Sequence, residues 1–295
     1  MVFLFAVISI FLLFACSFGK RTDGEEDHRK RSERIYGITI DDSWYESLDA
    51  DQVLAAIRKM PVKPTARIVM SEDISPQNYK KLFMQIKKEA YIMASPVDSY
   101  YMKAYQDEEA YLKRFQDSYD ALSDYVDIWE IGNEINGVEW IRQDPELIID
   151  KVSEANAFIR SKGGRTALTL YYTNPEEEDM FEWISEYFPD ELYEEVDYVL
   201  LSYYEEDNEG YEPEWEQVFS SLEKVFPGAK LGIGECGNTA EDASVSDKIE
   251  RARSYYMMES HSENFIGGYF WWNWVQDCVP HQNNKVYEEI NRCME

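Results

Sequence analysis

The sequence predicts an α/β fold, a (β/α)8 TIM barrel, formed as a single domain by residues 35–295. Short runs rich in β-branched and aromatic residues alternate with longer runs of helical periodicity. The alternation repeats eight times in about 260 residues, which matches such a barrel in number, order and size. No linker or break in composition divides this stretch, so we expect one domain. A doubly wound open sheet is the alternative.

The first half of this stretch is expected to supply four pairs of strand and helix. Several of the helical runs begin at an Asp, Ser or Pro start signal, and the fourth ends at a pair of glycines. In order, the expected segments are strand 35–41, helix 49–60, strand 66–71, helix 75–89, strand 90–95, helix 107–126, strand 127–132 and helix 145–164.

The second half repeats the pattern with four further pairs. The expected segments are strand 165–171, helix 179–188, strand 196–203, helix 212–226, strand 229–234, helix 247–261, strand 266–272 and helix 283–294. In barrels of this kind the active site lies at the C-terminal ends of the strands. Polar residues that directly follow a strand are therefore the candidates for chemistry.

The composition excludes several classes of function. Lys and Arg total 29 against 58 Asp and Glu, a formal charge of −29, whereas a nucleic-acid-binding protein needs surplus basic residues. The same charge repels anionic polymers, so neutral glycans are the safer substrates. The three histidines, His28, His261 and His281, are too few for a His-rich zinc site or a Ser-His-Asp triad. We expect no metal and no cofactor, and chemistry carried out by carboxylates.

The N-terminus has the pattern of an export signal. Residues 2–18 carry no charge, and residues 1–18 are expected to be a signal peptide or lipoprotein signal, followed by a charged tether over 19–34. Leu13-Phe14-Ala15-Cys16 resembles a lipobox, in which Cys16 would be lipidated. We expect an exported monomer, secreted or anchored to a membrane only through this N-terminus. An uncleaved membrane anchor is the alternative.

Three cysteines follow Cys16, namely Cys236, Cys278 and Cys293. This number does not make a disulfide framework, although an oxidising compartment would allow one bridge. Cys236 and Cys278 both fall at the catalytic face, so a bridge between them is easier than one to Cys293.

Two glutamates follow two strands on opposite sides of the expected barrel. Strand 127–132 leads into Asn133-Glu134, and strand 229–234 leads into Glu235. A closed barrel brings these residues to one mouth. Hydrolysis of a glycosidic bond uses such a pair: one carboxyl protonates the leaving oxygen while the other attacks or stabilises the anomeric carbon. The alternative is that both are ordinary solvated acids, but the Asn-Glu pair at one strand end and Glu at the other is a specific combination.

This arrangement resembles the clan A glycoside hydrolases, a superfamily of retaining (β/α)8 barrels, over roughly residues 35–295. The resemblance implies that Glu134 is the acid/base and Glu235 the nucleophile. It also implies substrate-binding or supporting roles for Asn133 at the sugar 2-hydroxyl, Arg67 beside the nucleophile, Tyr204 (or its neighbour Tyr203) as a hydrogen-bond donor to it, and Trp272 under the first sugar ring. The histidine that the family often carries near strands 4 and 6 is missing.

The resemblance implies different protonation states for the two acids. Arg67 and a tyrosine hydroxyl should favour the charged form of Glu235 and lower its pKa. A charged Glu235 about 5 Å away should raise the pKa of Glu134, so that Glu134 holds a proton.

Short motifs narrow the resemblance further. Gly132-Asn133-Glu134-Ile135, Ser202-Tyr203-Tyr204 and, more loosely, Ile40-Asp41-Asp42-Ser43-Trp44 are similar to motifs of the arabinogalactan endo-β-1,4-galactanase family. Mannanase-, glucanase- and xylanase-like relatives are the alternatives. Aromatic residues near the strand ends, with Trp44 and Trp140 among them, suit stacking on sugar rings and favour an oligosaccharide and endo action.

These observations lead to one functional hypothesis with two alternatives. The leading one is a retaining glycoside hydrolase that cleaves β-linked oligo- or polysaccharides of plants or microbes by double displacement. The first alternative is a non-catalytic carbohydrate-binding surface protein on a degenerate barrel. The second is a transglycosylase that uses the same two acids.

Overall fold

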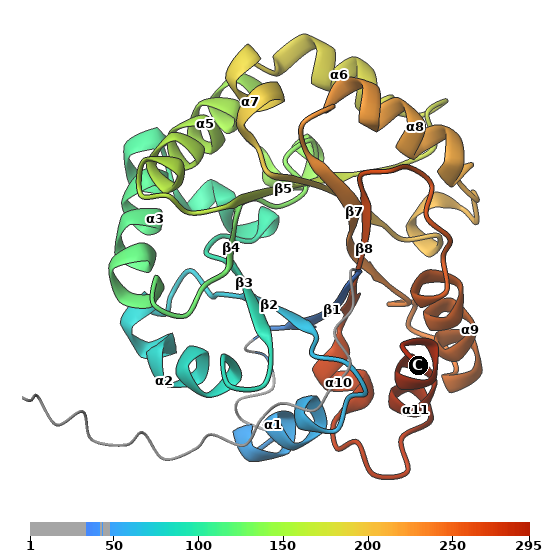
Figure 1. Ribbon diagram of the computed structural model, residues 1–295. Helices are drawn as coiled ribbons and strands as arrows, with labels where there is room; N and C mark the ends of the chain where they lie inside the picture. Colours follow the sequence, from blue (N-terminus) through green and yellow to red (C-terminus); the bar gives the residue numbers. More distant parts are fainter. Residues whose placement is uncertain (1–33, 42, 44–47) are drawn as a thin grey trace, which may run out of the picture.

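The fold prediction is confirmed. A computed structural model describes residues 34–41, 43 and 48–295, and its strands form one closed barrel in chain order with every neighbouring pair parallel (Figure 1). The strands are β1 (Ile35–Ile40), β2 (Thr65–Val69), β3 (Tyr91–Ser95), β4 (Ile128–Gly132), β5 (Thr166–Tyr171), β6 (Tyr198–Tyr203), β7 (Lys230–Gly237) and β8 (Phe265–Trp272). Each corresponds to an expected strand; β7 continues past the predicted end and includes Glu235.

Helices surround the strands on the outside of the ring (Figure 1). The eight expected helices are α1 (Ala50–Arg58), α2 (Pro76–Ile86), α3 (Glu108–Leu122), α5 (Pro145–Ser161), α6 (Met180–Tyr187), α8 (Trp215–Val225), α9 (Val245–Tyr256) and α11 (Lys285–Cys293). The structure adds short elements that the sequence did not predict, namely α4 (Val138–Ile141), α7 (Asp190–Glu195), α10 (Trp274–Cys278) and the 3-10 helices η1 (Ser99–Ala104) and η2 (Glu206–Asn208).

Helix α3 shows how the sequence sets these elements. The carboxylate of Asp107 accepts a hydrogen bond from the backbone N–H of Ala110 at 2.8 Å and caps the first turn. Tyr111, Phe115 and Leu122 recur at helical spacing and are fully buried against the barrel. Burial of this one face, rather than helix propensity, holds the helix in place.

The barrel interior is apolar at one level and charged nearer the mouth. Met93, Ile128, Ala167, Leu200 and Phe270, each from a different strand, form a buried cluster separate from the main core between strands and helices. Such a layer closes the barrel below the site. The polar side chains at the strand ends therefore stand on a packed floor.

The remaining N-terminal and cysteine predictions have different outcomes. Cys16 and Trp44 lie outside the described residues, so lipidation, export and the role of Trp44 stay predictions. No helix in the described part of the chain is long and apolar enough to span a membrane. The bridge that we considered between Cys236 and Cys278 is absent: both thiols are free and fully buried among apolar side chains of the core, and Cys293 is free as well.

Candidate active site

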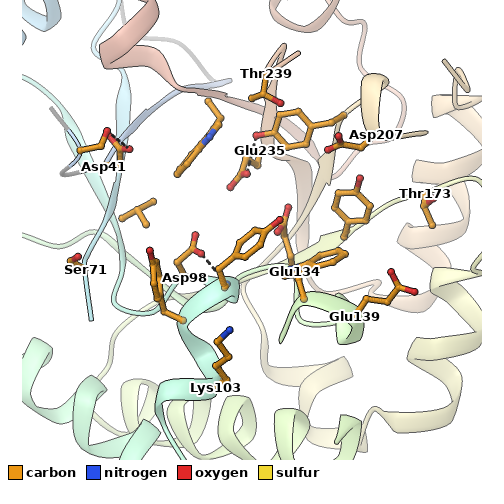
Figure 2. A pocket seen from close by; sticks show the side chains of 18 of the residues that line it. Asp41, Ser71, Asp98, Lys103, Glu134, Glu139, Thr173, Asp207, Glu235 and Thr239 are labelled. Atoms are coloured by element: carbon orange, nitrogen blue, oxygen red, sulfur yellow. Dashed lines mark hydrogen bonds between the residues drawn. The ribbon is translucent and has the colours of Figure 1, made fainter. Parts of the chain in front are cut away.

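A pocket of about 1000 Å³ opens at the C-terminal ends of the strands, where the fold predicts it. Glu134 and Glu235 both line it, and Figure 2 shows them with Asp98 around the same hollow. Trp140, Tyr204 and Trp272 also lie in its wall. The structure therefore brings the two predicted acids and three predicted binding residues into one cavity.

Glu134 lies two residues beyond the end of β4 and is held by two serine hydroxyls. Ser99 of η1 donates to its Oε2 at 3.0 Å, and Ser202 of β6 donates to its Oε1 at 2.5 Å. The backbone of Glu134 lies in the left-handed region, with φ of 46°, a conformation that costs energy for a residue other than glycine. Asn136 fixes the following turn, because its side chain exchanges two hydrogen bonds with the backbone of Tyr171, each of 2.8 Å.

Glu235 of β7 is held by a cation and a phenol. The Arg67 guanidinium donates to its Oε2 at 2.5 Å, and the Tyr204 hydroxyl donates to its Oε1 at 2.9 Å. Burial raises the pKa of Tyr204 well above its ordinary value, so the hydroxyl keeps the proton that it donates. Tyr203 faces elsewhere, because its hydroxyl donates to the backbone carbonyl of Tyr211.

Arg67 is fully buried and joins Glu235 to a third glutamate that we did not predict. Its Nε donates to Glu130 Oε2 at 2.8 Å, and the Thr169 hydroxyl donates to the other oxygen of Glu130 at 2.6 Å. Burial alone would lower the pKa of Arg67, but Glu130 and Glu235 outweigh it and raise this pKa. The guanidinium is a permanent charge beneath the pocket.

The protonation of the pair differs in part from the sequence-based expectation. Burial, and then the charge of Glu235, raises the pKa of Glu134 to about 8, as expected in direction. Burial also raises the pKa of Glu235 above its ordinary value, although Arg67 and the Tyr204 hydroxyl act in the opposite direction. The expected lowering for Glu235 is therefore wrong in sign, because the cost of burying the carboxylate exceeds the stabilisation by its partners. Glu235 still ionises more readily than Glu134, since only Glu235 contacts the guanidinium.

The Tyr204 contact makes a prediction. In Tyr204→Phe, Glu235 loses one donor to its charged form, so we expect kcat/KM for an aryl β-glycoside to fall about tenfold or more. The matched control is Tyr203→Phe, which removes a neighbouring hydroxyl that does not touch Glu235. Equal losses in the two variants would contradict a specific role for Tyr204.

Two further predicted side chains are Asn133 and Trp272. Asn133 directly follows β4 but is buried and does not line the pocket, and its side-chain oxygen has no hydrogen-bond partner among the described residues. Trp272 is half-buried at the end of β8, where β7 and β8 approach so closely that a Cβ on Gly237 would lie 2.1 Å from the Trp272 carbonyl oxygen. Only glycine fits there, and this proximity places Trp272 beside the Glu235 strand.

Four polar residues of the site were missed by sequence reasoning: Ser99, Ser202, Glu130 and Asp98. Two of them, Glu130 and Ser202, could have been found from their spacing, because alternate residues of a strand share a face. Glu130 lies four residues before Glu134, and Ser202 lies two residues before Tyr204. Asp98 and Ser99 lie in the loop and 3-10 helix after β3, where the sequence carries no comparable pattern.

The pocket wall is strongly acidic. Among the described lining residues, Lys103 is the single basic one. Besides the central pair, the lining contains six carboxylates: Asp41, Asp98, Glu139, Glu177, Glu178 and Asp207. In the part of the chain that the structure describes, no three His, Cys, Asp or Glu side chains are grouped to hold a metal ion. The arrangement suits proton transfer and nucleophilic attack by carboxylates.

Fold and site together define a (β/α)8 barrel with a carboxylate pair at its mouth, the architecture of many glycosidases. No protein-family model matches the sequence, and no curated protein is similar enough in sequence to be counted as a relative. Solved structures do match in fold.

The structural matches are glycosidase barrels of low sequence identity. A family 1 β-glucosidase from Thermotoga maritima gives a TM-score of 0.55 at 12% identity, over 83% of this chain and 88% of that one. A rice β-glucosidase in covalent complex with glucose gives 0.59 at 10%, over 82% and 90%. A family 10 endoxylanase from a sugarcane soil metagenome gives 0.56 at 12%, over 88% and 96%. At these identities the similarity shows the fold alone: the chain shares the barrel of clan A glycoside hydrolases, and the likeness to the galactanase family rests on its short motifs.

Proposed function

We propose that this protein is a retaining glycoside hydrolase that cleaves β-linked oligo- or polysaccharides, with Glu134 as acid/base and Glu235 as nucleophile. The observation that carries the proposal is the unlike surroundings of two buried carboxyls in one pocket. Arg67 and Tyr204 hold Glu235, whereas hydroxyls alone hold Glu134. A double displacement needs one carboxylate and one carboxylic acid, and these surroundings supply them.

The roles of the residues follow from these contacts. Ionised Glu235 would attack the anomeric carbon while the Glu134 proton passes to the leaving oxygen. When Glu235 is esterified its charge is lost, so Glu134 becomes more acidic and can accept a proton from the attacking water. The role of Asn133 at a sugar 2-hydroxyl stays a prediction from the family resemblance, because its side-chain oxygen is buried and the residue does not line the pocket.

The pocket supports a substrate longer than one sugar. Its volume of about 1000 Å³ lies at the upper end of ordinary ligand pockets, and aromatic residues stand in its wall: Tyr100, Tyr101, Trp140, Tyr171 and Trp272. The acidic lining repels anionic glycans. We therefore propose a neutral β-glycan and endo action. From the uncharged run of residues 2–18 we also propose export of the protein to where such polymers occur.

The pKa of Glu134 predicts the alkaline limit of activity. Glu134 must hold its proton to act as acid, so kcat/KM should fall as pH rises through about 8. The acid limit is set by Glu235, whose raised pKa means that protonation removes the nucleophile at a higher pH than it would for an ordinary glutamate. Initial rates between pH 4 and 10 check this, and a rate that continues to rise well above pH 8 would contradict the assignment of Glu134.

The proposed function is tested with residues 20–295 on β-mannan, β-galactan, xylan and mixed β-glucans by release of reducing ends. We expect cleavage of one glycan by the unaltered chain and loss of cleavage in both Glu134→Gln and Glu235→Gln. Full activity of both variants would overturn the site. Binding of a glycan without cleavage would instead support a non-catalytic carbohydrate-binding protein.

A further inference from the structure

A chain of two hydrogen bonds leads from a pocket tryptophan to Glu134. The indole Nε1 of Trp140 donates to Ser99 Oγ at 3.1 Å, and Ser99 Oγ lies 3.0 Å from Glu134 Oε2. Ser99 is fully buried. Trp140 itself lines the pocket in front of this chain.

The direction of both bonds is fixed by chemistry. An indole N–H can only donate, so it occupies a lone pair of the serine oxygen. The serine hydroxyl has one hydrogen, and among the contacts of the described residues Glu134 Oε2 is the acceptor within its reach. Ser99 therefore donates to Oε2 when Glu134 is ionised, and this hydrogen bond stabilises the carboxylate.

We propose that Ser99 and Trp140 are positioning residues: they orient Glu134 and stabilise its carboxylate through a donor at Oε2, and so set how readily this acid gives up its proton. The inference rests on the proposed function for its catalytic meaning. In the first step the O–H bond of Glu134 breaks, the proton joins the leaving oxygen, and the electron pair stays on Glu134. Donation from Ser99 stabilises the carboxylate so formed.

The chain also connects the acid to the pocket wall. Trp140 packs against Tyr100, with ring centroids 6.3 Å apart and planes at 25°, and meets Tyr171 edge-on at 5.1 Å. A sugar bound at this wall would contact the residue that orients Ser99. Other titratable groups interact with Glu134 across the pocket from several elements, so their effect must be held constant in any test: Glu235, Asp98, Tyr100, Tyr171 and Tyr204.

The direct test follows the titration of Glu134 without any substrate. Protein labelled with 13C at the glutamate side-chain carboxyl is titrated by NMR, and the Glu134 signal is assigned by its loss in Glu134→Gln. We expect Ser99→Ala to lower the acid dissociation constant of Glu134 about tenfold, because a donor to the carboxylate is lost. Trp140→Phe should act in the same direction. The control is Tyr203→Phe, which removes a hydroxyl bonded to the Tyr211 carbonyl and not to this chain, and it should have no effect.

The double variant distinguishes a chain from two separate influences. If Trp140 acts through Ser99, Ser99→Ala with Trp140→Phe should titrate as Ser99→Ala alone. Additive shifts, or an unchanged titration in Ser99→Ala, would overturn the proposal. Because Trp140→Phe keeps an aromatic ring, it preserves most of the packing if Ser99→Ala folds poorly.

The dependence of kcat/KM on the leaving group distinguishes an effect on the acid from a purely structural effect of the substitution. Expulsion of 2,4-dinitrophenolate needs little protonation, whereas expulsion of phenolate depends on the acid. With aryl β-glycosides of galactose, mannose, xylose and cellobiose, Ser99→Ala should lower kcat/KM about tenfold for phenyl substrates and leave dinitrophenyl substrates unchanged. Equal losses of kcat/KM on phenyl and dinitrophenyl substrates would contradict the proposal. If no glycoside is cleaved, the proposed function fails, and the NMR titration still decides the hydrogen-bond chain.

Discussion

Glu235→Gln is expected to lower the rate of glycan hydrolysis by at least about 10⁴-fold, because an amide cannot form the glycosyl ester. The amide has the shape of the carboxyl: its oxygen can accept from Arg67, and its NH2 group can donate to the Tyr204 hydroxyl oxygen. Loss of activity would therefore report lost chemistry rather than a collapsed pocket. Initial rates with an aryl β-glycoside and with the cleaved polysaccharide measure the effect.

The matched control for this variant is Glu177→Gln. Glu177 is an exposed carboxylate on the wall of the same pocket, and its replacement by Gln changes the net charge by the same amount as Glu235→Gln. We expect it to retain most of the activity. Comparable losses in the two variants would mean that the acidity of the pocket, and not a particular nucleophile, supports the reaction.

Arg67→Met is expected to produce the largest loss of stability, about 3–5 kcal/mol in the free energy of unfolding, since it leaves buried glutamates without their cation. The Arg67 and Glu130 side chains are fully buried and that of Glu235 nearly so. Urea unfolding at neutral pH measures the change. Lys113→Met, which breaks an exposed ion pair with Asp117, should cost less than about 1 kcal/mol.

The pH dependence of this variant has a definite sign. Burial already raises the pKa of Glu235, and removal of Arg67 should raise it further. A group with a raised pKa in the folded state contributes full stability below its unfolded pKa and loses it as pH rises through the folded value. The difference in free energy of unfolding between Arg67→Met and the unaltered chain should therefore be smaller near pH 4 than at neutral pH. An equal difference at pH 4 and pH 7.5 would contradict this account.

The barrel could be predicted from sequence because its signal is repeated. Eight alternating segments constrain one another, so small errors at single boundaries did not alter the topology. The end of β7 was placed three residues early, since Glu235-Cys236-Gly237 does not read as a strand until the close approach of β8 pairs it. Short elements such as α4 and α10 bury too few residues to leave a periodic pattern.

The central pair of the site could be predicted for a related reason, because each acid lies at the C-terminal end of a buried strand. The hydrogen-bond partners of this pair were harder to predict from the sequence. Ser99 follows β3 in a 3-10 helix, and nothing in its local sequence indicates that it will meet Glu134, which lies 35 residues away. The sign of the Glu235 shift was missed because the sequence names the cation but does not measure how deeply the carboxylate is buried.

The most direct test of the central claim is peptide mapping after reaction with a 2-deoxy-2-fluoroglycosyl fluoride of the cleaved sugar. The fluorine slows hydrolysis of the glycosyl ester, so the intermediate of a retaining enzyme accumulates on its nucleophile. We expect one added glycosyl mass, located on Glu235 and absent in Glu235→Gln. A label on another residue, or release of the inverted anomer without any label, would contradict the assignment of Glu235 as nucleophile.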